Sequence, residues 1–468
     1  MRRATFRALL ALAGAAALAR PALAHAGALS GGTSSAIPFW FVVVTGGSVV
    51  AASFLFSTLI TDHEGIRMVN GWGLSLPAPG SLRAALPRIL QGLGTLVLAV
   101  VLASALVGPR EATENFAVLF VWAGWWAGYT MTVYLVGNTW PAVNPWALPA
   151  AGARRVADLL SVERRSLPEA GTWLAVVGLL ALVYVEVVTP VAEAPRLLAG
   201  VLVVYTVVTL TGAALVGPAE WFGRVDPVAR VFRWYGRMAP VHRTEDGVRL
   251  RLPTTGLTET ETLEGPDETP FVLALLWVTT FDGLVSTPPW AAFVRAVIPD
   301  GGGLPGYLLA LALYLAALVA GYVLFLAAYR WAARTSRSTA GSYVAPGAIG
   351  RWFVPSLLPI AAGYHVAHFL GYFLTLSPAL AATLTSPFAA PAGVEVAVLP
   401  GWYSTVQLAL VVLGHMLAVW VAHGLSFELF PGTFKPIRSQ YPFIVVMVFY
   451  TMTSMWVISQ PYVAPPGV

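Results

Sequence analysis

The sequence predicts an all-α membrane protein, a single polytopic bundle of about ten transmembrane helices that follows a cleavable signal peptide. Three observations lead to this fold class. Of the 468 residues, 57% are apolar and only 10% are charged, with a mean hydropathy of +0.73, whereas soluble domains carry about 25% charged residues. Long apolar runs recur along the chain. The arginines are distributed very unevenly between alternate loops.

Residues 1–24 are predicted to be the signal peptide. A basic start precedes an apolar run that is short for a membrane span, and Ala22-Leu23-Ala24 forms a small-x-small cleavage pattern. An uncleaved anchor helix is the alternative. Cleavage would leave His25 at the amino terminus, where its amine and ring together can chelate a metal ion. Residues 25–468 then form one polytopic membrane domain.

Ten apolar runs after the signal peptide are long enough to cross the hydrocarbon layer, which is about 30 Å thick. In lipid such runs must be helical, because every backbone amide needs an internal partner. The predicted helices cover residues 37–61, 88–108, 116–137, 170–190, 196–217, 269–287, 304–330, 348–375, 402–424 and 441–460.

The positions of the Lys and Arg residues test the number of predicted helices and indicate the orientation of the bundle in the membrane. With both mature termini outside, only Arg110, Arg196 and Arg295 fall in outer loops. Every other Lys or Arg after residue 24 falls in an inner loop, as the positive-inside rule requires. The predicted location is therefore the plasma (inner) membrane. The cations are placed by topology, so we expect lipids as partners and no nucleic acid.

The longest inner loop covers residues 218–268. It contains the basic amphipathic stretch VARVFRWYGRM, which the sequence predicts to lie against anionic inner-leaflet lipid. The polar, hairpin-like GVRLRLPTTGL follows it. Two shorter features are architectural. The segment 138–146 ends the third helix, with its tryptophans expected at headgroup level, and Asn115 is expected to be a helix N-cap.

Ionisable side chains inside membrane helices are costly, which makes them candidates for function. The eighth helix carries His365 and His368, which share one face because they are three residues apart. The ninth carries His415 and the sixth carries Asp282. By depth, these four side chains can meet in the outer half of the bundle, roughly 10–20 Å below its outer end at about 1.5 Å per residue.

Three further residues are weaker candidates. Glu186 ends the fourth helix near the outer surface, His423 falls at the inner interface, and Tyr372 lies one heptad beyond His365. The chain has no cysteine, so a metal site must use His, carboxylate, Met or backbone oxygen ligands. The combined set is typical of a divalent transition metal: zinc, iron or copper. A proton or ion path, or purely structural polar packing between helices, is the alternative.

With these residues identified, most of the mature chain resembles the fenitrothion hydrolase family of bacterial and archaeal multi-pass membrane proteins. The sequence departs from the family pattern at Arg224-Val225-Asp226-Pro227, where relatives tend to have Gly-Glu. The matching segments are Ala24-His25, Asn115-Phe116-Ala117, Val143-Asn144-Pro145-Trp146, Glu186, Thr279-Thr280-Phe281-Asp282-Gly283, Tyr364-His365-Val366-Ala367-His368, Gly414-His415-Met416, Ala422-His423 and Gln440-Tyr441-Pro442.

The resemblance implies a membrane-bound hydrolase of organophosphate triesters. In this first hypothesis Asp282, His365, His368 and His415 bind the metal, and Asp282 and Tyr372 act in catalysis on a lipophilic substrate that arrives from the bilayer. A second hypothesis is a protein that handles or transports copper or another divalent ion, captured first at His25 and passed to His423. A third is a membrane scaffold or assembly factor whose histidines only bridge helices.

Overall fold

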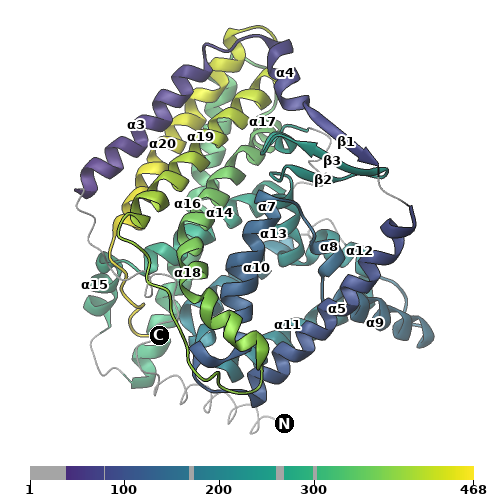
Figure 1. The fold of residues 1–468 in the computed structure, drawn as a ribbon. Helices are drawn as coiled ribbons and strands as arrows, with labels where there is room; N and C mark the ends of the chain where they lie inside the picture. The colour runs from purple at the N-terminus through teal and green to yellow at the C-terminus, as the bar shows by residue number, and fades with distance from the viewer. Residues whose placement is uncertain (1–37, 78–79, 168–172, 260–267, 299–302) are drawn as a thin grey trace.

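The computed structural model describes residues 38–77, 80–167, 173–259, 268–298 and 303–468. Within these ranges nine helices are long and apolar enough to cross a membrane, and the shorter apolar helix α10 (Trp173–Val188) is a tenth. Each of the ten predicted runs coincides with one of them. The all-α prediction is therefore confirmed, and the helices indicate a multi-pass membrane protein (Figure 1). The predicted signal peptide and His25 lie outside the described residues.

The spanning helices pack against one another. Helix α3 packs against both α19 and α20, which also contact each other, and α18 packs against α19. The nine are α3 (Phe39–Ser57), α5 (Gly80–Val107), the run α6 (Phe116–Leu119), η2 (Phe120–Tyr129) and α7 (Thr130–Leu135), α11 (Pro195–Val216), α14 (Glu268–Val285), α16 (Gly303–Thr339), the run α17 (Pro346–Phe353), η8 (Val354–Leu357) and α18 (Leu358–Thr385), α19 (Tyr403–Leu429) and α20 (Phe434–Ser459).

Shorter elements connect the spans. A three-stranded antiparallel sheet of order β1-β3-β2 lies at one end of the bundle, near α4 and α7 (Figure 1). The strands are β1 (Gly73–Pro77), β2 (Val241–Arg243) and β3 (Gly247–Arg251), and the short helices are α4 (His63–Gly71), η1 (Ala112–Glu114), α8 (Trp140–Val143), α9 (Ala147–Leu159), η4 (Pro190–Ala192), α12 (Pro218–Glu220), η5 (Trp221–Val225), α13 (Pro227–Gly236), η6 (Thr255–Leu257) and α15 (Pro288–Val297).

The hairpin expected within residues 247–257 lies earlier in the chain, because β3 (Gly247–Arg251) pairs with β2 (Val241–Arg243) and residues 255–257 form η6. A third strand, β1, joins from another loop. Strands β2 and β3 pair with Val241 opposite Leu250, and β1 pairs on the other edge of β3 with Leu74 opposite Leu250. Strand β1 has only five residues, so its short Gly-Leu-Ser-Leu-Pro pattern carries little signal in the sequence.

The amphipathic helix predicted within residues 218–268, α13, is mostly buried in the protein. Its Arg230 is 1% exposed and forms an ion pair of 3.2 Å with Glu268, the first residue of α14. Arg233 binds the other carboxylate oxygen of Glu268 at 2.6 Å, and the Trp234 indole donates to Glu268 at 2.7 Å. The prediction that this helix contacts anionic lipid is wrong, because most of its side chains are buried within the protein and Arg230 and Arg233 both bind Glu268.

The tryptophans of segment 138–146 also differ from expectation. Trp140 and Trp146 are 4% and 6% exposed, so they do not anchor at headgroup level. Both pack against other aromatic rings, and the Trp146 indole donates to Thr206 of α11 at 2.9 Å. Asn115 is an N-cap as predicted, since its side-chain oxygen accepts from the Val118 amide at 3.2 Å.

Helices α18 and α19 approach each other at paired glycines. A side-chain carbon added to Gly363 would lie 2.9 Å from the Gly414 Cα, and one added to Gly414 would lie 2.5 Å from the Pro359 carbonyl oxygen. Only glycine permits backbones to come this close, as in the small-residue contacts typical of membrane helices. The two histidine-bearing helices therefore meet backbone to backbone.

Asp226 caps α13 in a buried setting and predicts a pH dependence. Its carboxylate accepts from the Ala229 amide at 2.7 Å and from the Tyr205 hydroxyl at 2.5 Å, yet burial raises its pKa to about 6. The folded state therefore takes up this proton at higher pH than the unfolded chain does. As pH falls from 7 towards 4, protonation of Asp226 should stabilise the fold.

The variant Asp226→Asn should lack this contribution because its amide does not titrate. We expect its stability relative to the wild type to be greater at pH 7.5 than at pH 5, by roughly 1–3 kcal/mol. Thermal unfolding of both proteins in detergent at the two pH values measures the difference. If the stability of Asp226→Asn relative to the wild type is the same at pH 5 and pH 7.5, Asp226 is not protonated near pH 6.

Candidate functional site

The clearest polar contact between membrane helices joins α14 and α18. The His368 Nε2 atom lies 3.3 Å from Asp282 Oδ2, and both side chains are partly exposed, at 20% and 16%. Gly283 makes room beside them, because a carbon added there would lie 2.2 Å from the Tyr364 hydroxyl oxygen. The sequence prediction that Asp282 and the eighth helix come together is thus reflected in this pair.

A second carboxylate and a tyrosine lie near the pair. Glu186, at the end of α10, is half-buried and interacts electrostatically with Asp282. The segment after α20 contributes Tyr462, whose pKa is raised by burial and by the charges of Asp282, Glu186 and Glu193. The Val463 amide holds this segment in place by donating to the Ser286 carbonyl at 2.9 Å. Tyr462 was not predicted, since an isolated tyrosine after the last span carries no sequence signal.

The two histidines of the eighth helix diverge. His365 is 1% exposed, and its Nδ1 atom lies 3.1 Å from the Tyr134 hydroxyl of α7, away from Asp282. Its ring also packs edge-on against Trp126 at 5.6 Å. The Nε2 atom has no hydrogen-bond partner among the described residues. A 60° difference in direction around the helix is enough to send the two rings to different neighbours.

The remaining predicted residues make other contacts. In α19, His415 Nδ1 bonds to the Val411 carbonyl at 2.8 Å, and the ring faces Tyr450 at 5.9 Å. His423 contacts the Ile60 carbonyl at 2.8 Å and Gln440 at 3.3 Å. Tyr372 is buried in α18 and interacts electrostatically with Glu186.

The structure therefore brings together two of the four predicted metal ligands and separates the other two. Asp282 and His368 are in contact, whereas His365 and His415 make separate contacts in the core. Within the residues that the structure describes, no three His, Asp or Glu side chains are arranged to hold a metal ion. A bound zinc, iron or copper ion remains a prediction.

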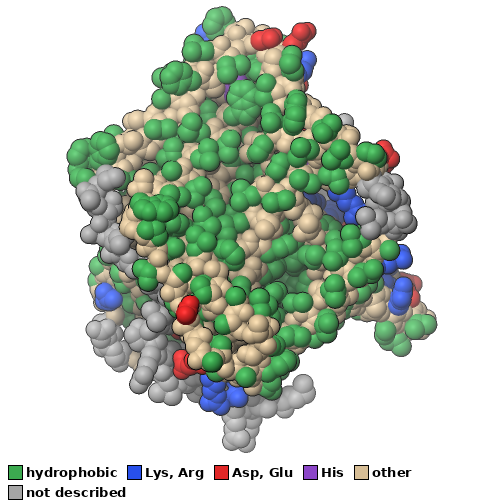
Figure 2. All heavy atoms as spheres, in the orientation of Figure 1, with side chains coloured by type: hydrophobic (Ala, Val, Ile, Leu, Met, Phe, Trp, Pro, Cys, Tyr) green, Lys and Arg blue, Asp and Glu red, His purple; other side chains and the backbone are tan. Residues whose placement is uncertain are grey.

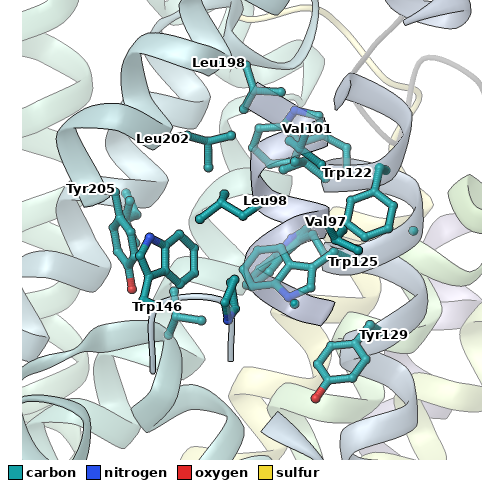
Figure 3. Close-up of a pocket in the computed structure, with 18 of the residues that line it drawn as sticks. Val97, Leu98, Val101, Trp122, Trp125, Tyr129, Trp146, Leu198, Leu202 and Tyr205 are labelled. Carbon is teal, nitrogen blue, oxygen red and sulfur yellow. The ribbon is translucent and has the colours of Figure 1, made fainter. Parts of the chain in front are cut away.

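An apolar cavity of about 600 Å³ lies between α5, η2, α10, α11 and α13. Figure 3 shows aromatic side chains around it, with Leu98 between Trp146 and Trp125. Glu186 also lines the cavity and, among the residues that the structure describes, is the only charged one that does so. One residue of the cavity wall thus interacts electrostatically with Asp282.

The cavity opens sideways rather than into a soluble domain. Its lining includes Leu93, Val97 and Leu384, which are 52%, 37% and 57% exposed on the outside of the bundle. Apolar side chains cover most of the face of the molecule shown in Figure 2, including the hollow beside α5. In a bilayer this face would contact lipid.

No protein-family model matches the chain, and no curated protein or solved structure matches it significantly. The class that the fold defines is therefore a multi-pass membrane protein. The resemblance to the fenitrothion hydrolase family stays a prediction from the sequence motifs.

Proposed function

We propose that this protein is a plasma-membrane hydrolase of lipophilic, organophosphate-type esters, with its reactive centre at Asp282 and His368. The observation that carries the proposal is the 3.3 Å contact between these side chains beside a carboxylate that also lines an apolar cavity. A reactive pair that adjoins an apolar chamber suits a substrate that dissolves in the bilayer.

The pair has the geometry of an oriented base. At 3.3 Å from His368 Nε2, the Asp282 carboxylate can accept a hydrogen bond from that nitrogen when it carries its proton, and Nδ1 would then take a proton from water. That water oxygen would bond to phosphorus as the bond to the leaving oxygen breaks, and the proton would remain on His368. The Asp282 charge stabilises the imidazolium that forms. Tyr372 interacts with Glu186, and its hydroxyl is the candidate hydrogen-bond donor to the oxygen of the leaving group.

Activity of two histidine variants tests the proposal. Hydrolysis of a neutral aryl phosphotriester is measured with wild type, His368→Ala and His365→Ala in detergent. We expect His368→Ala to lower kcat by about 10²–10⁴-fold, the usual contribution of a general base. His365→Ala should lower it far less, because His365 contacts Tyr134 rather than Asp282. Equal activity of wild type and His368→Ala would contradict the proposed role.

Elemental analysis of the same preparations tests the predicted metal. About one equivalent of zinc, iron or copper in the wild type, lost in a folded His365→Ala/His368→Ala variant, would support metal-dependent hydrolysis or, with vectorial uptake in vesicles, metal handling. Absence of hydrolysis, metal and uptake, together with loss of fold in the variant, would favour the scaffold hypothesis.

A further inference from the structure

The apolar cavity has walls that select among lipophilic molecules. The rings of Trp122, Trp125, Trp126, Trp140 and Trp146 line it, and aromatic rings offer both faces and edges to a ring-bearing ligand. Among its lining residues only Glu186 is charged. A charged ligand would lose its hydration there without an opposite charge in the walls, except a cation at Glu186. The lining therefore favours a neutral molecule.

Two hydrogen-bond donors in these walls are unsatisfied. The indole N–H groups of Trp122 and Trp140 are buried and have no partner among the described residues. In contrast, the Trp146 indole, in the same cavity, donates to Thr206. A buried donor without a partner costs about 1–3 kcal/mol. Both nitrogens are closed off from the cavity in this structure, so an acceptor oxygen on a bound ligand would remove this cost once either ring turns its N–H towards the cavity.

We propose that the cavity binds a neutral, ring-bearing lipophilic molecule that carries a hydrogen-bond acceptor oxygen and enters from the bilayer between α5 and α18. The exposed lining residues Leu93, Val97 and Leu384 form the entrance. A cavity of about 600 Å³ is within the range of sites for small organic ligands.

This inference deepens the proposed function, because the cavity would hold the lipophilic substrate next to Glu186 and Asp282. Only the role of the bound molecule as a substrate rests on the proposed function. Binding can be measured with compounds that have no bond to hydrolyse, so a failure of binding is distinguishable from a failure of catalysis.

The experiment compares two probes of similar shape in nanodiscs. Triphenylphosphine oxide carries three rings and one acceptor oxygen, whereas triphenylmethane carries the rings alone. Binding is measured by quenching of tryptophan fluorescence. Leu98→Trp, which fills the cavity, should weaken binding of both probes by about tenfold or more. The matched control Leu96→Trp on the same helix should leave both unchanged, since Leu96 is 60% exposed and does not line the cavity.

The unsatisfied donors are tested by Trp122→Phe and Trp140→Phe. Each should weaken binding of the phosphine oxide by about five- to tenfold, the equivalent of one hydrogen bond, with little change for triphenylmethane. Trp146→Phe should affect both probes equally, because its indole already has a partner. Equal binding of both probes to all three variants, or binding unaffected by Leu98→Trp, would overturn the inference. If one tryptophan variant fails to fold, the other still decides.

Discussion

Replacing Glu268 with alanine is expected to lower the free energy of unfolding by about 3–5 kcal/mol, the usual cost of breaking a buried ion pair. Glu268 is 3% exposed and binds Arg230, Arg233 and the Trp234 indole. Arg230 would remain 1% exposed without its carboxylate partner. Since these contacts join α13 to the start of α14, their loss should also release α13 from the bundle.

Chemical unfolding in detergent measures this effect, with Glu428→Ala as the control. Glu428 pairs with Arg67 at 2.8 Å, but the two side chains are 30% and 59% exposed, so this change should cost about 1 kcal/mol or less. Replacing Arg230 and Glu268 together by Met and Leu should recover much of the loss, because the buried charge is then removed. Equal small losses for both single variants would refute the buried-pair argument.

Replacing Asp282 with asparagine is expected to lower kcat for ester hydrolysis by about 10²–10⁴-fold while folded yield is retained. Asparagine preserves the shape of the side chain but removes the charge that stabilises protonated His368. The change should act on kcat more than on KM, because the ligand cavity is lined by Glu186 and aromatic rings rather than by Asp282.

A distant carboxylate provides the control for this measurement. Glu395 is exposed in the segment between α18 and α19, and Glu395→Gln should leave activity unchanged. Tyr372→Phe separates the second catalytic candidate from Asp282, since it removes one hydroxyl near Glu186 and leaves the charge intact. If Asp282→Asn keeps full activity, the reactive centre lies elsewhere in the bundle.

The fold was largely predictable because the membrane imposes length and hydropathy on every span. All ten predicted runs are helices, although α10 has only 16 residues. The errors arose where protein contacts replace lipid or water. Arg230 has the spacing of a lipid-binding cation, yet Glu268 neutralises it, and Trp140 and Trp146 turn inward to line a cavity. Sequence periodicity does not reveal which neighbour covers a given face.

The candidate site was predictable in its residue types and only partly in its contacts. Rare intramembrane charge identified Asp282 and His368, which are in contact. Their separation from His365 and His415 was not predictable, because ring direction depends on partners such as Tyr134 and Val411 that no spacing specifies. Tyr462 enters the site through the fold of the terminal segment, which is a non-local effect.

The glycine contact between α18 and α19 has a consequence for the response of the protein to lipid composition. These helices have 28 and 27 residues, more than the approximately 20 needed to cross a bilayer, so membranes of different thickness should alter their tilt. Gly363 and Gly414 hold the two backbones in contact, which makes the helices tilt as one unit. The spacing of their histidines should therefore be the same in thin and thick bilayers.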